Sequence, residues 1–188
     1  MVTRAAREES GFGMIELLMA IVMLNIGILA IIGALNSGAL ALGRASTTAT
    51  AATLAETQME GYRGLKYTNV VFDTTEWNAA VGDASYTADP VYQQNMANPV
   101  APKALVASIT GGACTATGSP ATVPASCDPS RVVRGPDGKS YRVDTYLYYD
   151  TPNGGQQLKV VTVVVRAAAQ LTTALARISS TFDSSSGQ

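Results

Sequence analysis

Apolar residues dominate one long stretch near the start of the chain. From Leu17 to Gly43 the sequence contains no charged residue. A helix of roughly 27 residues rises roughly 40 Å, which exceeds the roughly 30 Å hydrocarbon core of a bilayer. The pattern therefore predicts one membrane-spanning helix. Through this helix the chain is expected to bind a membrane.

The helical pattern continues past the apolar stretch. Ala52, Ala55, Met59 and Tyr62 recur at the spacing of one helix face, and the charged residues nearby lie mostly outside that stripe. Glycines at positions 61 and 64 lower the helix propensity, so the helix should end near Lys66. We predict a helix over 12–66 that spans a membrane to about residue 43, with an apolar stripe in its second half that needs cover.

An alternating pattern appears late in the chain. Residues 141–149 alternate, with Val143, Thr145 and Leu147 on one face, and 158–166 is rich in valine. The turn residues of 152–155 between them predict an antiparallel hairpin. Further strands are expected over 174–182 and near 104–110. Residues 68–102 indicate a long surface loop and 184–188 a frayed tail. The expected fold class is α+β, a long helix packed against a small antiparallel sheet.

Two cysteines, Cys114 and Cys127, flank a segment rich in small and polar residues. Outside a membrane the surroundings are oxidising, which favours a disulfide. Such a loop contributes about 3 kcal/mol in the chain-entropy model. Two free thiols or a metal site are the alternatives. A structural zinc site usually needs four ligands and the chain has no histidine, so no metal is expected.

The composition argues against a nucleic-acid-binding protein, since the formal net charge of the 188 residues is −1. Arg131, Arg134 and Arg142 form the one small cationic group that could contact DNA. Tyr146 and Tyr148 share a strand face and could form a binding platform for sugars or a partner subunit. Because tyrosine is also a good strand former, half-buried packing is the simpler interpretation.

No catalytic arrangement is evident. Without histidine there is no Ser-His-Asp or Cys-His pair, and no S-x-x-K motif occurs. Residues 135–140 end like a phosphate-binding loop, but Val133 occupies the first glycine position, and Asp137-Gly138 predicts a tight turn instead. The acidic residues Asp73 and Glu76 are isolated. We expect neither an enzyme nor a cofactor.

One carboxylate, Glu16, lies at the edge of the apolar stretch, where an unpaired charge is costly. Ahead of it, a polar leader ends at Gly11 and is followed by Phe12. This arrangement resembles the N-terminus of type IV prepilins and pseudopilins. The resemblance implies that a prepilin peptidase cleaves after Gly11 and methylates the amine of Phe12. Glu16 of an incoming subunit would then pair with the Phe12 amine of a neighbour, because two partners that lack water attract strongly.

Within that family the chain is most similar to PilV-type minor pilins. Gly33 stands where major pilins commonly carry a proline, and Gly27 and Gly38 permit close approach of helices. The glycines could equally reflect their general frequency in membrane helices. An ordinary signal anchor, or a secretory signal cleaved within 39–45, are the alternatives for the N-terminus.

The resemblance implies a leader over 1–11, a helix over 12–66 and an extracytoplasmic β domain over 67–188. It implies a subunit of a pilus-like filament that is held in the cytoplasmic (inner) membrane and later assembled outside the cell. Its partners would be the prepilin peptidase, other pilin subunits and an inner-membrane assembly platform. A surface binding module, such as an adhesin on an uncleaved anchor, is the alternative, and a membrane-tethered enzyme is a third.

Overall fold

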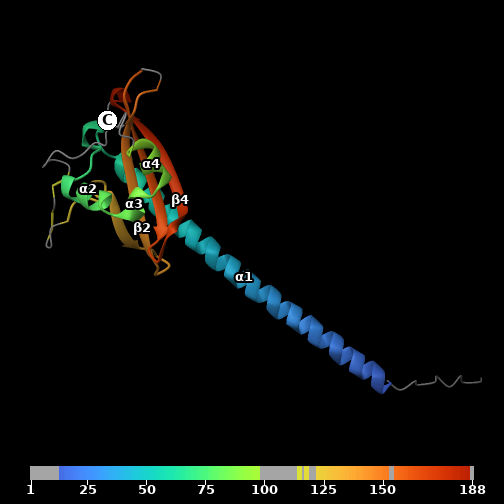
Figure 1. The fold of residues 1–188 in the computed structure, drawn as a ribbon. Coiled ribbons are helices and arrows are strands. Elements are labelled where there is room, and N and C mark those ends of the chain that lie inside the picture. Colours follow the sequence, from blue (N-terminus) through green and yellow to red (C-terminus); the bar gives the residue numbers. More distant parts are fainter. Residues whose placement is uncertain (1–12, 98–113, 116, 119–121, 153–154, 187–188) are drawn as a thin grey trace, which may run out of the picture. The chain divides into compact units, whose positions relative to one another are not determined.

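The structure is a computed structural model that describes residues 13–97, 114–115, 117–118, 122–152 and 155–186. The chain divides into two units, Met1–Ala45 and Ser46–Gln188. One helix, α1 (Met14–Arg63), contributes to both (Figure 1). It ends three residues before the predicted end, where Gly64 N donates to Glu60 O (3.1 Å) and Leu65 N donates to Tyr62 O (3.0 Å).

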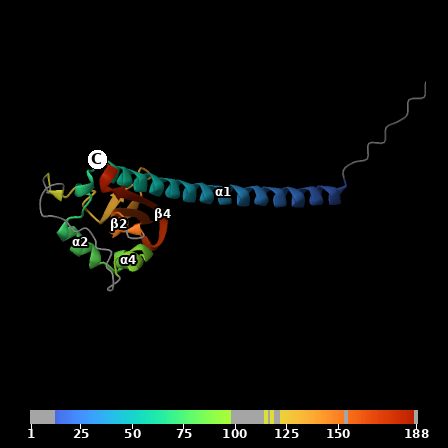
Figure 2. The ribbon, with the colours of Figure 1, turned by 90° about the horizontal axis from the view of Figure 1, so that it is seen from above.

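The second unit contains a four-stranded antiparallel sheet in the order β1-β2-β3-β4. Its strands are β1 (Ser130–Arg134), β2 (Ser140–Asp150), β3 (Leu158–Ala167) and β4 (Gln170–Asp183). Each strand pairs with the next one along the chain. Figure 2 shows the sheet from above, with β2 and β4 labelled. The predicted hairpin and the predicted strand over 174–182 are therefore confirmed, and the α+β fold class with them.

One predicted strand is not tested, and one observed strand was not predicted. The strand predicted near 104–110 lies outside the described residues. The sequence did not predict β1, which is short and pairs along its whole length with the start of β2. Residues 135–139 form the turn between these strands, and Gly138 has the positive φ of 76° that the tight turn requires. A turn, not a phosphate-binding loop, is thus the structure of this segment.

The helix-facing side of the sheet forms the main core. Ala51, Ala55, Met59 and Tyr62 of α1 are at most 1% exposed and pack against valines of β2 and β3. Each large side chain buried in this way contributes about 2 kcal/mol. The predicted apolar stripe is confirmed at three of its four positions. Ala52 is only half-buried, and Ala51 occupies the core instead.

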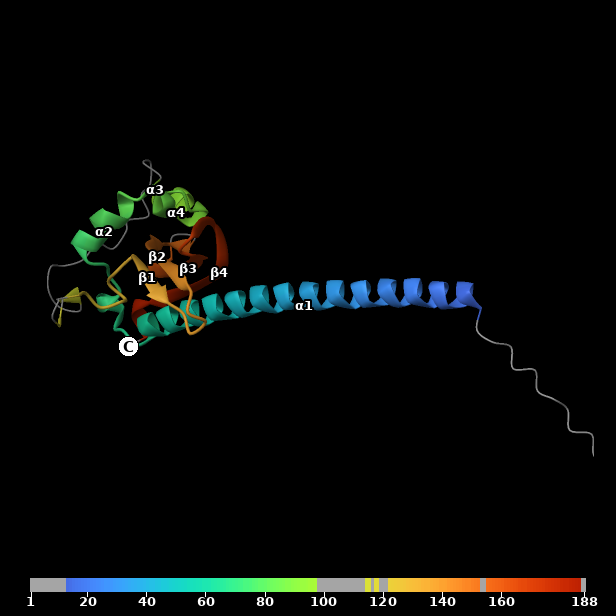
Figure 3. The same ribbon diagram turned by 90° about the horizontal axis from the view of Figure 1, so that it is seen from below.

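The long surface loop predicted over 68–102 is wrong for the described part of that range. Three short helices form there: α2 (Thr74–Val81), α3 (Ala84–Thr87) and α4 (Pro90–Asn95). Each begins after an aspartate, Asp73, Asp83 or Asp89, whose carboxylate accepts hydrogen bonds from amides of the first turn. Figure 3 shows these helices on the opposite side of the sheet from α1.

The three helices cover a second, aromatic core. Tyr86 and Tyr146 are fully buried there with Ala80 and Val164, and Trp77 and Tyr92 pack at the edge. The binding platform proposed for Tyr146 and Tyr148 is therefore not available, since Tyr146 is inaccessible and Tyr148 is half-buried. At the end of the chain, residues 184–186 form a short 3-10 helix, η4 (Ser184–Ser186), where a frayed tail was expected.

Candidate functional site in the apolar half of the first helix

Glu16 lies in the first turn of α1 and is exposed. Its amide donates to Gly13 O (2.9 Å), and the amide of Leu17 donates to the same oxygen (3.2 Å). The free amides of a first helical turn carry partial positive charge, which favours a carboxylate at this position. Gly11 and Phe12, the predicted processing site, lie outside the described residues.

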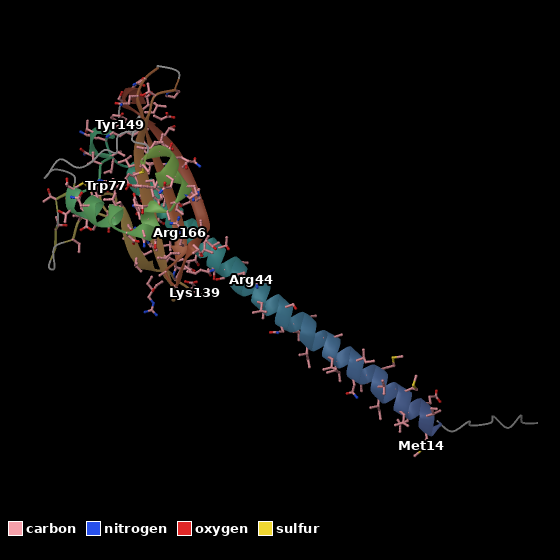
Figure 4. The ribbon with its side chains drawn as sticks, in the orientation of Figure 1. Met14, Arg44, Trp77, Lys139, Tyr149 and Arg166 are labelled. Carbon is pink, nitrogen blue, oxygen red and sulfur yellow. A yellow bond between two sulfur atoms is a disulfide. The ribbon has the colours of Figure 1, made fainter. Side chains whose placement is uncertain are left out.

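The apolar side chains that follow Glu16 are uncovered. Every large hydrophobic residue between Met14 and Leu42 is exposed, from 46% at Ile28 to 85% at Met14. Figure 4 shows these side chains radiating from the helix between the labelled Met14 and Arg44. The helix is long and apolar enough to span a membrane. Since exposed apolar area costs about 25 cal/mol per Å² in water, this surface needs a bilayer or an apolar partner.

The glycines of this segment have open space around them. A Cβ atom added at Gly27, Gly33 or Gly38 would meet no described atom within 4 Å. The packing described for this chain therefore does not require glycine at these positions. The small surface that they leave would allow the backbone of another helix to approach closely.

The sheet carries a second candidate beneath α3 and α4, a chain of charges that is buried at its centre and partly exposed at both ends. It alternates aspartate and arginine in the order Asp83, Arg142, Asp144, Arg166, Asp89, Arg177. Arg142 joins Asp83 (Nη1–Oδ2, 2.6 Å) to Asp144 (Nε–Oδ1, 2.8 Å). Arg166 joins Asp144 (Nη1–Oδ2, 2.6 Å) to Asp89, and Arg177 also binds Asp89 (Nη2–Oδ2, 2.9 Å).

These six residues balance three positive against three negative charges, and they tie α3 and α4 to the sheet. Partial burial opposes ionisation of Asp83, but the amide of Ser85 and the guanidinium of Arg142 hold the pKa of Asp83 below its ordinary value. Because every carboxylate in the chain of charges already binds an arginine, we interpret the cluster as a structural clamp.

The cationic patch predicted to contact DNA does not form, in part because Arg142 belongs to the clamp. The side chain of Arg142 is buried and neutralised by two aspartates. Arg131 lies on the helix-facing side of the sheet, where its Nη2 donates to Gln58 Oε1 (2.7 Å). Of these three arginines, only Arg134 is exposed. The three arginines therefore do not form one surface.

A lysine is buried at the other end of the sheet. Lys159 is 3% exposed, and its Nζ donates to the backbone oxygens of Tyr67 (2.7 Å) and Val70 (2.9 Å). Burial lowers the pKa of Lys159 to about 8. The ammonium group also lies 4.5 Å from the ring centre of Tyr67. This lysine connects β3 to the segment that follows α1.

The disulfide predicted between Cys114 and Cys127 is present. Both cysteines are buried against Val71, and the amide of Asp73 donates to Cys127 O (2.9 Å). The disulfide thus joins two positions ahead of β1, and the contacts with Val71 and Asp73 hold it against the segment before α2. In the part of the chain that the structure describes, no group of three acidic or sulfur side chains is arranged to hold a metal ion.

The sequence did not predict four of these functional candidates, namely the clamp residues Asp83, Asp89, Arg166 and Arg177. A signal for two of them existed, since aspartate before Pro90 and aspartate before a short helical run both suggest N-caps. The arginines gave no such signal.

A scan against protein-family models and searches of the curated proteins and of the solved structures found no match to this chain.

Proposed function

We propose that this chain is a structural subunit, a minor pilin or pseudopilin, of a type IV pilus-like filament. It is processed by a prepilin peptidase after Gly11 and assembled through α1. The observation that carries the proposal is the first half of α1, where one carboxylate, Glu16, precedes a continuous and fully exposed apolar surface.

The apolar surface of α1 would be covered first by the membrane and later by the filament. In the membrane, lipid covers the exposed side chains of α1, and the chain is a single-pass protein of the inner membrane with its second unit outside. In a filament, the same side chains pack against the helices of neighbouring subunits. Small residues such as Gly27 and Gly33 allow close approach there.

Glu16 supplies the specificity of assembly. An apolar surface alone would permit many registers between helices, whereas a buried carboxylate needs a cation at one place. The methylated amine of Phe12 on a neighbouring subunit would be that cation. The second unit, with its disulfide and charge clamp, would face outward as a stable extracellular domain.

Mass spectrometry of the mature N-terminal peptide, taken from membranes and sheared filaments, tests this proposal. A peptide that begins at methylated Phe12 is the expected result. An intact Met1, or cleavage within 39–45, would contradict it and would favour an anchored or secreted surface binding module instead. A Gly11→Val variant is the matched control, since it should retain the leader.

A further inference from the structure

One end of the sheet combines positive charge with small apolar residues. The turn between β1 and β2 carries Arg134 and Lys139, and the turn between β3 and β4 reads Ala167, Ala168, Ala169, Gln170, Leu171. The two turns touch, because the amide of Ala168 donates to Ser140 O (3.0 Å). We call residues 134–140 and 167–171 the turn end of the sheet.

Both cations of the turn end face solvent from fixed positions. Arg134 Nε donates to Gly138 O (3.1 Å), and the residue is exposed. Lys139 Nζ donates to Thr47 Oγ1 (2.5 Å), while its side chain is 56% exposed. Asp137, the nearby acid, pairs with Lys139 (Nζ–Oδ2, 3.9 Å) and accepts a hydrogen bond from the Tyr141 hydroxyl (2.6 Å), and its side chain is 13% exposed, so two cations stand against one acid here. The surface of the turn end is therefore positive.

The turn between β1 and β2 is also tightly packed. A Cβ atom at Gly135 would lie 2.7 Å from Thr50 Cγ2 and 2.8 Å from Tyr141 Cε2, so the turn packs closely against α1. Little conformational freedom is then lost when a ligand binds to this turn.

Acidic residues lie at the opposite end of the sheet, near the buried Lys159. Asp150 and Asp183 flank Leu158 there in neighbouring strands, as the strand register shows. Figure 4 places Lys139 and Tyr149 at these two ends of the sheet. The two ends of the sheet thus differ, since the exposed cations Arg134 and Lys139 lie at the turn end and two aspartates lie at the far end.

Few residues separate Thr47, the partner of Lys139, from the predicted membrane span. Thr47 follows Gly43, the last residue of the charge-free stretch, by four positions in α1. Four residues cover about 6 Å in a helix and at most about 14 Å when extended. The headgroup layer outside the hydrocarbon core is roughly 5–8 Å thick. With Gly43 at the edge of the hydrocarbon core, as the predicted span has it, Lys139, bonded to Thr47, is within reach of lipid headgroups.

We propose that the turn end is a membrane-surface contact that binds the phosphates of anionic phospholipid headgroups while α1 is in the bilayer. Arg134 and Lys139 bind the phosphates, and the alanine turn with Leu171 rests at the boundary between headgroups and acyl chains. This inference depends on the membrane-spanning role of α1 within the proposed function, but not on filament assembly.

Amine labelling of the full chain tests the proposal, with Lys139 as the probe and the exposed Lys66 as the internal control. The chain is placed in phosphatidylcholine vesicles, in vesicles with added phosphatidylglycerol, and in neutral maltoside micelles. Flotation with the vesicles first verifies that α1 has inserted. Mass spectrometry then gives the ratio of labelling at Lys139 to labelling at Lys66.

We expect Lys139 to label about threefold more slowly in vesicles with phosphatidylglycerol than in micelles, with a smaller effect in phosphatidylcholine alone. Arg134→Gln should restore much of the labelling, and Arg63→Gln, at the end of α1, should not. Equal labelling in vesicles and micelles would overturn the proposal. Protection of Lys139 that changes neither with lipid charge nor in Arg134→Gln would also overturn the proposal, since such protection would indicate steric cover alone. A chain that fails to float would instead contradict the membrane role of α1.

Discussion

The rings of Tyr86 and Tyr146 stack with their centres 4.5 Å apart and their planes at 25°. Their hydroxyls bind backbone oxygens across the same interface. Tyr86 Oη donates to Thr145 O (2.6 Å), and Tyr146 Oη donates to Tyr86 O (3.0 Å). Each ring thus connects the helical layer to the sheet through both its face and its hydroxyl.

Removal of the Tyr86 hydroxyl should weaken this connection. In Tyr86→Phe the oxygen of Thr145 loses a buried donor, and we expect the free energy of unfolding to fall by about 1–2 kcal/mol. Urea unfolding of the full chain in maltoside, followed by the fluorescence of the single tryptophan, Trp77, measures the change. Tyr92→Phe, at the half-buried edge of the same cluster, is the control and should cost less than about 0.5 kcal/mol.

The charge clamp should be sensitive to its most buried acid. Asp89 both caps α4 through Val91 N (2.8 Å) and binds Arg166 and Arg177. Asparagine caps helices about as well as aspartate, so Asp89→Asn removes the charge and keeps the cap. We expect a loss of about 3–5 kcal/mol, because Arg166 stays buried with less compensation. The same urea titration measures this loss.

Asp73→Asn is the matched control for the clamp. Asp73 caps α2 through the amides of Thr75 (2.8 Å) and Glu76 (3.3 Å), and it has no ion pair among the described residues. The free energy of unfolding of the Asp73→Asn variant should differ from that of the parent protein by less than about 0.5 kcal/mol. Similar losses in both variants would show that capping, and not charge pairing, stabilises this layer.

Reduction of the disulfide should destabilise the second unit. The link between Cys114 and Cys127 closes a sequence separation of 13 residues, and its loss should lower the free energy of unfolding by about 3 kcal/mol. Urea midpoints with and without dithiothreitol measure this effect. A double variant with serine at both positions should have the urea midpoint of the reduced protein, and dithiothreitol should not change that midpoint.

Stability should rise with pH above about 8 because of Lys159. Its pKa is lowered to about 8 in the folded chain, below the ordinary value of 10.5. Between these two values the unfolded chain binds more protons than the folded chain, so the free energy of unfolding increases with pH. We expect a gain of about 1–2 kcal/mol from pH 8 to 9.5. Below about pH 7.5 the lysine is protonated in both states and its contribution is constant.

Lys159→Met should abolish the pH-dependent gain, whatever its effect on absolute stability. The free energy of unfolding at a series of pH values, for the variant and the parent protein, checks this. Lys66→Met, at an exposed position, should retain the full rise. An identical pH dependence in Lys159→Met and the parent protein would contradict the assignment, since buried tyrosines with raised pKa values act on both proteins alike.

Filament assembly should depend on the charge of Glu16. Glu16→Ala is expected to leave cleavage after Gly11 intact and to reduce incorporation into sheared filaments at least about tenfold, because the Phe12 amine then lacks its partner. Glu16→Asp keeps the charge and should retain partial incorporation. Immunoblots of membrane and filament fractions measure both. Normal incorporation of the alanine variant would exclude charge pairing as the guide to assembly.

Local patterns predicted the parts of the fold with strong periodicity. The apolar run predicted α1, the alternating residues and valines predicted β2 and β3, and two cysteines in a segment poor in apolar residues predicted the disulfide. These features depend on neighbours in the sequence. Strand β1 has only two apolar residues, Val132 and Val133, so its pairing with β2 decides its structure and periodicity does not.

The aromatic core and the charge clamp depend on contacts that no local pattern contains. Arg142 and Arg166 are 24 positions apart in the sequence, yet the strand register makes them direct cross-strand neighbours. Asp144 can neutralise both only because it lies on the same face, two residues along β2. The helices α2 to α4 are short and have weak propensity, and packing against the sheet stabilises them.

The double use of Asp83 and Asp89 has a consequence for the order of folding. α3 has four residues and α4 has six, too few to persist alone in water. Their capping acids are also the acids that bind arginines of the finished sheet. These helices should therefore form last, as products of docking. Their amides should gain protection from hydrogen exchange together, and only after the strands have paired.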